Sequence, residues 1–268
     1  MGGMTVDGAR LRRELRALGV RQGSVLLTHC SLRSVGRVDG GATTLLDALL
    51  KVLGEEGTLV VPAQTRSKSA TSTEFLRAVS GLTPAERESY LELLPGFDPA
   101  VTPSEGMGAL AEAVRAHPAA GRSAHPSTSF AALGRHAAEL TGSHPIESFL
   151  GDDSPLGWMD RAGAYVLLLG VGYDKCTAFH LGEDRSFSPL RGYRFKIGDT
   201  WRDVPLAPDY DDSDFMELGA RFEVEHKEEI VFGPVGAATC RLFPLTAAAR
   251  FAEKWLPETR RGNARPSR

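Results

Sequence analysis

The sequence predicts a three-layer α/β/α fold with a mostly parallel central sheet. Three short apolar runs, at residues 24–29, 58–63 and 165–171, are bounded by glycines or turn residues and are apolar on both faces. Strands of a parallel sheet have this composition because helices cover both faces of the sheet. Residues 44–53 lie between the first two runs and have the apolar spacing of a helix, which predicts a β-α-β unit.

Two further elements flank this core in the sequence. Residues 8–18 are predicted to form an amphipathic helix, because leucines recur at helical spacing and Gly19 follows as a helix-ending residue. Residues 190–204 alternate in polarity on either side of Gly198 and Asp199, which predicts a hairpin. The predicted fold also includes antiparallel additions.

The whole chain, residues 1–268, is predicted to form one domain. Its composition, 42% hydrophobic and 24% charged, is that of a protein with a large buried core. Residues 66–102 are polar and irregular, and a helix is expected to start at Thr83, since proline follows it and Glu86 suits the first turn. We interpret this segment as a helical insertion beside a substrate cleft. The basic tail at 260–268 lacks apolar anchors and is expected to fray.

Composition also excludes several classes of function. A net charge of -3 lacks the excess of lysine and arginine that nucleic-acid binding requires. No signal peptide and no apolar stretch long enough to cross a bilayer is found, so we expect a cytoplasmic protein without a membrane partner. The cysteines, Cys30, Cys176 and Cys240, are too widely spaced for a zinc site or a disulfide framework, and no metal is expected. The oligomeric state is left open.

Candidate chemistry follows the predicted strands. Residues 28–36 supply small hydroxyls and backbone N–H groups, which suit either an anion cradle or an ordinary connection to a helix. His180 follows the third strand, at the end where ligands gather in open α/β sheets. If a helix starts at Thr177, His180 and Glu183 share one face of it, but no second pair completes a metal site. His125 precedes a proline, and both a structural and a functional role are open.

An acidic run at residues 208–214 follows the hairpin. Such a run is typical of a solvated loop or of a helix N-terminus. Alternatively, one of its carboxylates lies near His180, holds the tautomer of the imidazole and stabilises the imidazolium.

Five motifs occur in the order of one known family, at residues 25–32, 57–62, 97–103, 122–126 and 168–180. Through them the chain, over residues 11–215, resembles the aminoglycoside 3-N-acetyltransferases, which are antibiotic N-acetyltransferases unrelated in fold to the GNAT enzymes. The resemblance implies an α/β/α fold and acetyl-coenzyme A as the acetyl donor. It also implies that the acceptor is the 3-amine of an aminoglycoside or a related polyamine sugar, and hence a role in antibiotic resistance.

The resemblance also assigns roles to residues. His180 falls on the family's catalytic histidine, and Asp209 and Asp211 fall on a family pattern of glutamate, any residue, aspartate. Asp209 replaces the glutamate with a shorter side chain, so a backbone shift or a water must restore its reach. The donor is expected against Ser31, Leu32, Arg33, Ser34, Val35 and Ser123. The acceptor is expected at Asp98, Asp209, Asp211 and Glu183.

Together these residues predict acetyl transfer with His180 as the general base. The substrate ammonium must lose a proton before its nitrogen attacks a thioester, and imidazole titrates in the useful pH range. Asp209 or Asp211 is expected to raise the basicity of His180. Backbone N–H groups at 31–35 are candidate donors to the thioester oxygen in the tetrahedral intermediate.

Three alternatives remain open from the sequence. An acetyl group carried on Cys30 or Cys176 would make the transfer covalent. An N-acetyltransferase of another small amine in biosynthesis would have a less acidic cleft. A catalytically weak protein that binds coenzyme A or an antibiotic would share the fold. The replacement of the family's glutamate by Asp209 leaves this alternative open.

Overall fold

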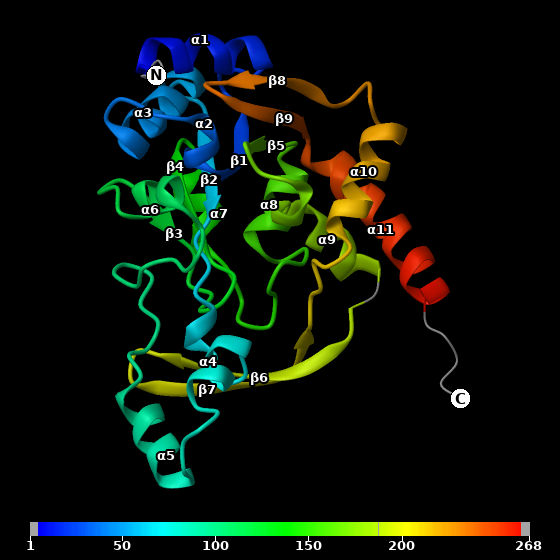
Figure 1. Cartoon of the computed structure of the whole chain (residues 1–268). Helices are drawn as coiled ribbons and strands as arrows, with labels where there is room; N and C mark the ends of the chain where they lie inside the picture. The colour runs from blue at the N-terminus through cyan, green and yellow to red at the C-terminus, as the bar shows by residue number, and fades with distance from the viewer. Residues whose placement is uncertain (1–4, 187, 264–268) are drawn as a thin grey trace.

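The computed structural model describes residues 5–186 and 188–263. In this part of the chain, seven strands form a central sheet in the order β3-β4-β2-β1-β5-β9-β8 (Figure 1). The strands are β1 (Val25–Cys30), β2 (Thr58–Pro62), β3 (Gly121–Arg122), β4 (Phe130–Gly134), β5 (Tyr165–Leu169), β8 (Val231–Val235) and β9 (Ala238–Pro244).

The centre of the sheet is parallel. Strand β1 pairs in parallel with β2 on one side and with β5 on the other, where Leu26 lies opposite Tyr165. Antiparallel strands β4 and β3 extend the sheet beyond β2, and β9 and β8 extend it beyond β5. The predicted α/β fold with antiparallel additions is confirmed, with the parallel pairing confined to the three central strands. Their carboxyl ends meet at one edge, where a site is expected.

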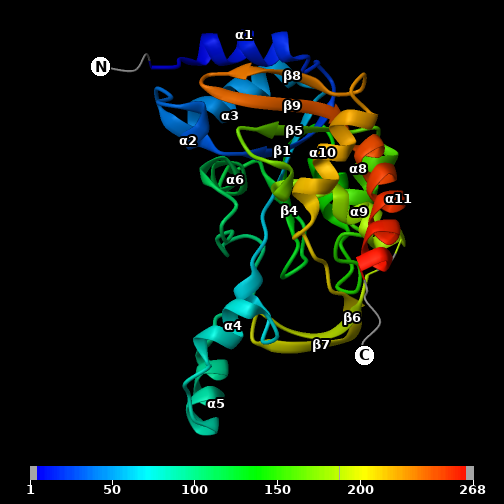
Figure 2. The same cartoon turned by 45° about the vertical axis from the view of Figure 1, so that its right-hand side comes forward.

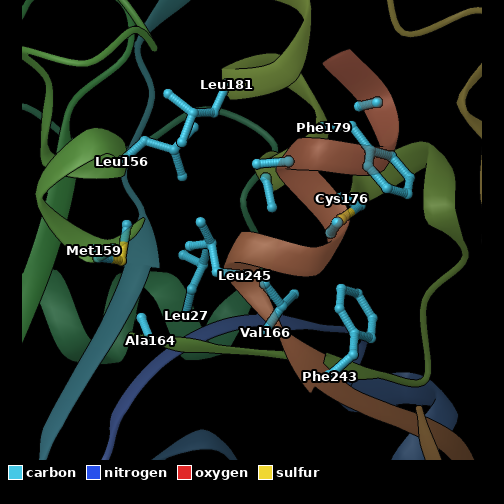
Figure 3. Packing of buried hydrophobic residues seen from close by; sticks show 14 of the residues in the cluster. Leu27, Leu156, Met159, Ala164, Val166, Cys176, Phe179, Leu181, Phe243 and Leu245 are labelled. Atoms are coloured by element: carbon cyan, nitrogen blue, oxygen red, sulfur yellow. The ribbon is translucent and has the colours of Figure 1, made fainter. Parts of the chain in front are cut away.

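Helices cover both faces of this sheet, as Figures 1 and 2 show. Alternate strand residues point to opposite faces, so Leu27 and Val166 belong to one buried cluster and Leu26 and Leu167 to the other. The first cluster includes α7 (Ala137–Gly142), α8 (Pro155–Arg161), α9 (Ala178–Ser186), α10 (Phe215–Glu225) and α11 (Leu245–Asn263) (Figure 3). The second includes α1 (Gly8–Leu18), α3 (Gly41–Leu53) and α6 (Ala109–Arg115).

Local chemistry explains the predicted N-terminal helix, which is confirmed as α1. The Asp7 side chain accepts a hydrogen bond from the Arg10 amide and caps the helix start. Gly19 ends the helix with φ of 103°, a left-handed conformation that favours glycine. The helix predicted at 44–53 begins three residues earlier than expected, at Gly41.

The segment 66–102 forms a separate lobe with the hairpin, at the bottom of Figure 1. It contains a short 3-10 turn, η1 (Arg66–Lys68), and the helices α4 (Thr73–Ala78) and α5 (Pro84–Leu93). Thr83 and Glu86 form the capping box that starts α5, as the sequence predicts. The hairpin pairs β6 (Leu190–Ile197) with β7 (Thr200–Pro208), so its second strand extends past the predicted end. The Phe97 amide donates to the Lys196 carbonyl at 2.7 Å and joins the two parts.

The C-terminal helix differs from the expectation of a frayed tail from residue 260. Helix α11 runs to Asn263, and Arg260 forms ion pairs with Glu183 and Asp214. Composition hides this anchor, because it is a single cation that pairs with acids far away in the sequence. The rest of the expected tail, residues 264–268, lies outside the described residues. Among the helices that are described, we find none with the length and apolar character required to span a membrane.

Candidate active site

A cavity of about 740 Å³ opens at the carboxyl ends of the three parallel strands. His29 and Cys30 end β1 on its wall, Pro62 ends β2 and Gln64 follows it, and Val171 follows β5. Helix α9 adds His180 to the same cavity. The structure therefore places His180 at the sheet edge where the sequence predicts ligand binding.

His180 is paired with Glu183 on the same helix. Its Nδ1 lies 2.7 Å from Glu183 Oε2, one turn further along α9. The helix begins at Ala178, directly after Thr177, which confirms the predicted helix start and the shared face of the two residues. A carboxylate at this distance fixes the ring orientation, and it places the Nδ1 proton on the side of Glu183.

Glu183 is fully buried, and its second oxygen is also occupied. Oε1 accepts hydrogen bonds from the Asp211 amide at 3.0 Å and from Arg260 Nη1 at 2.5 Å. The predicted contact between Glu183 and a substrate therefore does not agree with the structure, because both carboxylate oxygens bind protein donors. Glu183 instead has the orienting position that the sequence suggested for Asp209 or Asp211.

The acidic run after the hairpin leads into α10, and Asp214 occupies the N-cap position. The Asp209 carboxylate lies 2.9 Å from Arg191 Nε and does not contact His180. The Asp211 carboxylate accepts hydrogen bonds from the amide and hydroxyl of Ser213, both at 2.9 Å, so only the Asp211 backbone joins the His180 and Glu183 network. The neighbouring Asp212 lines the cavity instead.

Two aromatic rings pack against the His180 imidazole. The ring centroids of Tyr210 and Phe215 lie 5.1 Å and 4.6 Å from that of His180. The Tyr210 hydroxyl donates to Asp184 at 2.6 Å and accepts from the Leu150 amide at 3.2 Å. The ring of His180 is thereby held by packing as well as by its carboxylate.

In the structure, only part of the segment predicted to bind the donor lines the cavity. Ser31, Leu32 and Arg33 line the cavity, whereas Ser34 and Val35 lie outside its wall. Ser31 caps the short helix α2 (Leu32–Val35) by accepting from the Ser34 amide and hydroxyl. Val35 is completely buried in the second core cluster, because it packs under the sheet edge rather than facing the site.

Two other predicted contacts lie away from the cavity. Ser123 is completely buried, and its Oγ bonds to His144 Nδ1 at 2.9 Å and accepts from the Phe130 amide. Asp98 is exposed and caps a turn by accepting from the Ala100 amide at 2.8 Å. Neither residue is among those that line the cavity.

Sequence reasoning did not single out His29, which faces the cavity beside His180. The side chain is 6% exposed, and its Nε2 is buried without a hydrogen-bond partner among the described residues. Burial, with the nearby charge of His180, lowers the pKa of His29 to about 3. The ring is therefore neutral at physiological pH. Its only signal in the sequence is a histidine at the end of an apolar strand.

The cavity also contains several charged residues, of which only Arg33 was assigned a role from the sequence. Carboxylates line it at Glu74, Glu105, Asp174 and Asp212, and cations line it at Arg33, Arg66 and Lys175. The lobe formed by 66–102 supplies some of them, so this insertion borders the cavity. No group of three or more metal-ligating side chains is found in the described part of the chain.

Residues 27–257 match the family described as aminoglycoside 3-N-acetyltransferase. The chain belongs to this family. It is 37% identical to the SPbeta prophage-derived aminoglycoside N(3')-acetyltransferase-like protein YokD of Bacillus subtilis (strain 168), with 91% of this chain and 89% of that protein covered. It is 32% identical to aminoglycoside N(3)-acetyltransferase VIII of Streptomyces fradiae, with 98% and 95% covered. The predicted family is confirmed.

Solved structures of acetyltransferases have the same fold. The crystal structure of YokD matches with a TM-score of 0.90 at 35% identity, covering 97% of this chain and 96% of that one. A structure described as AAC-IIIb binary with CoASH matches with a TM-score of 0.81 at 27% identity, covering 96% and 98%. Nearly the whole length of both proteins therefore takes part in the similarity.

The cysteines of this acetyltransferase are poor nucleophiles. Burial, with a contribution from Cys240, raises the pKa of the Cys30 thiol to about 12. Burial also raises the pKa of Cys176, which packs in the core beneath α9, to about 12 (Figure 3). Because the thiolate is the nucleophilic form, neither side chain is suited to carry an acetyl group.

His125 has a structural role in this member of the family. It is completely buried, its Nε2 donates to the Ile146 carbonyl at 3.1 Å, and its Nδ1 accepts from the amides of Ser127 and Thr128. Burial holds the pKa of His125 well below its usual value. The ring is a neutral bridge between two loops rather than part of the cavity wall.

Proposed function

We propose that this protein transfers the acetyl group of acetyl-coenzyme A to the 3-amine of an aminoglycoside, which protects a cell from the antibiotic. The observation that carries the proposal is the His180 and Glu183 pair, whose imidazole lines a cavity of about 740 Å³. Membership of the acetyltransferase family supports the reaction type. Because the proposed donor is an intracellular metabolite, we place the reaction in the cytoplasm.

His180 acts as the general base through Nε2 in this proposal. Its Nδ1 faces Glu183, so the proton of the neutral ring lies on Nδ1 and the lone pair of Nε2 is available. Nε2 accepts the proton that the amine loses as its nitrogen bonds to the acetyl carbon. The C–S bond then breaks, and the imidazolium returns that proton to the departing thiolate. Transfer is direct, without an acetylated cysteine.

The proposed donor site is the wall formed by Ser31, Leu32 and Arg33. The Ser31 amide already donates to the Leu169 carbonyl, and those of Ser34 and Val35 donate to Ser31. The amides of Leu32 and Arg33 have no acceptor among the described residues. We assign them as the donors that stabilise the oxyanion of the tetrahedral intermediate.

The proposed acceptor site uses the carboxylates of the cavity. Glu74, Glu105, Asp174 and Asp212 replace the predicted set of Asp98, Asp209, Asp211 and Glu183, because the cavity is lined by the former group. Glu105 is held by the Ser67 amide at 2.9 Å, and Asp174 lies 3.0 Å from the Lys175 ammonium. Carboxylates held in this way attract the ammonium groups of an aminoglycoside.

A second candidate is an N-acetyltransferase of another small amine. The cations Arg33, Arg66 and Lys175 share the cavity with the four carboxylates, so the wall is less acidic than a polycation alone requires. An amine that also carries an anionic group suits such a mixed wall. The mixed charge of the cavity wall therefore supports small amines with an anionic group as a second acceptor class.

A turnover assay with a panel of acceptors tests the proposal. The purified protein is supplied with acetyl-coenzyme A and either aminoglycosides or small amines with anionic groups, and release of the coenzyme thiol is followed. Acetylation of an aminoglycoside at its 3-amine, located by NMR of the product, supports the first function. Turnover only with anionic amines supports the second function. No turnover with any acceptor, in a protein that binds the donor, contradicts both.

A further inference from the structure

Arg260 on the C-terminal helix joins the catalytic pair to the acidic run before α10. One guanidinium nitrogen lies 2.5 Å from Glu183 Oε1, and others contact both carboxylate oxygens of Asp214 at 2.8 Å. The guanidinium also donates to the Asp211 carbonyl at 2.6 Å. The side chain is 22% exposed, whereas Glu183 is fully buried. A single arginine thus connects α9, α11 and the start of α10.

Close packing of α9 against α11 places Arg260 within reach of Glu183. Gly182, the residue before Glu183, lies at the helix crossing, where an added Cβ would stand 2.3 Å from the Ala249 carbonyl oxygen. Ala248, Ala249 and Ala252 are completely buried on the facing side of α11. These small residues let the two helix backbones touch, so the position of Arg260 relative to Glu183 is fixed by the fold.

The contact resolves an electrostatic problem at Glu183. A carboxylate without solvent is strongly destabilised unless opposite charge and hydrogen bonds compensate it. His180 cannot supply this charge throughout the reaction, since a general base must begin neutral. Burial opposes the charge on Arg260, but hydrogen bonds to Asp214 and Glu183 hold the pKa of its guanidinium above the ordinary value. The permanent cation beside Glu183 is therefore Arg260.

We propose that Arg260 is a positioning residue, which keeps Glu183 ionised and directed at His180 Nδ1. The inference rests on the proposed function in one respect only, namely that His180 is the base. Arg260 does not line the cavity, so it acts through Glu183 rather than on the substrate.

The proposal predicts a pH effect of defined sign. His180 and Glu183 share one exchangeable proton, and loss of a nearby positive charge makes the pair hold that proton more tightly, whichever residue carries it. Removal of Arg260 therefore moves the acidic limb of the rate profile to higher pH. The other groups around the pair are His29 on β1, Asp174 and Lys175 after β5, Asp184 on α9, and Tyr210, Asp211, Asp212 and Asp214 before α10.

Arg260→Gln tests this effect, with Arg260→Lys and Arg185→Gln as controls. We expect R260Q to raise the midpoint of the acidic limb by on the order of one pH unit and to lower kcat at neutral pH by about tenfold. Affinity for acetyl-coenzyme A should stay within about twofold. R260K keeps the charge and should keep the midpoint. Arg185, which lies on α9 with Glu183, forms comparable ion pairs with Asp152 and Asp160 but does not contact Glu183.

An NMR titration of the His180 ring separates failure of this inference from failure of the proposed function. The titration needs no acceptor, and the signal is assigned by its loss in H180A. An unchanged midpoint in folded R260Q, or an equal shift in R185Q, overturns the role of Arg260. If R260Q does not fold, Asp214→Asn decides the matter: removal of this negative charge should lower the midpoint, and a rise or no change contradicts the proposal.

Discussion

His180 and Glu183 lie one turn apart on α9, and 2.7 Å separates the imidazole Nδ1 from the buried carboxylate. The pair is local in sequence, yet its carboxylate is completed by groups from two other elements, the Asp211 amide and Arg260. The ring nitrogen that faces the cavity is thereby left free to exchange a proton.

Replacement of His180 by alanine should lower kcat by roughly a hundredfold or more, because the general base is lost. Binding of acetyl-coenzyme A, measured by calorimetry, should change little, since the proposed donor wall lies on β1 and α2. Near-normal turnover in the folded variant would exclude His180 as the base.

Glu183→Gln should reduce kcat far more than Asp209→Asn. The glutamine removes the negative charge that stabilises the imidazolium, and we expect a loss of about tenfold or more. Asp209 contacts Arg191 on the hairpin, so the matched amide substitution there should leave kcat within about twofold. Steady-state kinetics on the two variants compare the roles directly. Equal losses of kcat in the two variants would show that Asp209 acts in the active site.

Charge reversal at Arg33 should weaken donor binding. Arg33 lines the cavity, and a carboxylate in its place repels the phosphates of acetyl-coenzyme A, so we expect R33E to raise Kd by about tenfold. R13E on the exposed face of α1 is the matched control and should leave Kd unchanged. Calorimetry at two salt concentrations should show the difference shrinking as screening increases. Similar affinity for R33E and the wild type would place the phosphates elsewhere.

Alanine in place of Cys30 should leave acetyl transfer intact. Its thiol stays protonated because burial raises its pKa to about 12, so it does not compete with the amine for the thioester. We expect kcat of C30A within a few-fold of the wild type and no acetylated enzyme by mass spectrometry after incubation with the donor alone. Accumulation of an acetyl group on Cys30 would contradict direct transfer.

Stability should fall as the solution is acidified below the ordinary histidine pKa. Burial lowers the pKa of His144 to about 4, so the unfolded state binds a proton below pH 6.5 that the folded state does not accept until about pH 4. This histidine therefore contributes its full stability above pH 6.5 and loses about 1.4 kcal/mol per pH unit within that window.

Urea unfolding of the wild type and His144→Asn at several pH values measures this contribution. The asparagine variant is expected to be less stable at pH 7, since the bonds of the ring to Ser123 and the Phe149 carbonyl are altered. Its stability should nevertheless depend less steeply on pH between 6.5 and 4, by about one proton. Parallel curves for the two proteins would show that His144 does not titrate as described.

The strands β1, β2 and β5 were predictable because each is a short run buried on both faces. Strand β8 contains Gly233 and Pro234, and β3 has only two residues, so their signals are weak in the sequence. These two strands form because neighbouring strands of the sheet offer hydrogen-bond partners. This tertiary context outweighs their weak local preference for strand structure. Strand direction also leaves no local signal: β4 is largely buried like its neighbour β2, but runs in the opposite direction.

The position of His180 at the sheet edge could be predicted from the sequence, whereas the residues that surround its side chain could not. Helical spacing identifies Glu183 as a neighbour of His180, but it does not reveal whether the carboxylate faces solvent or the core. Family correspondence favoured Asp209, whose carboxylate instead meets Arg191. Arg260 lies 77 residues from Glu183 in the chain, and no local pattern links the two.

The pairing of β1 with β5 has a kinetic consequence. It joins Leu26 to Tyr165 across a long stretch of chain, and closing so large a loop costs conformational entropy before contacts compensate it. Such topology slows folding, because distant segments must meet before the nucleus is stable. The cavity lies between the ends of these two strands, so it does not exist in any intermediate that lacks their pairing. Recovery of donor binding during refolding therefore reports the late, long-range step rather than the early formation of helices.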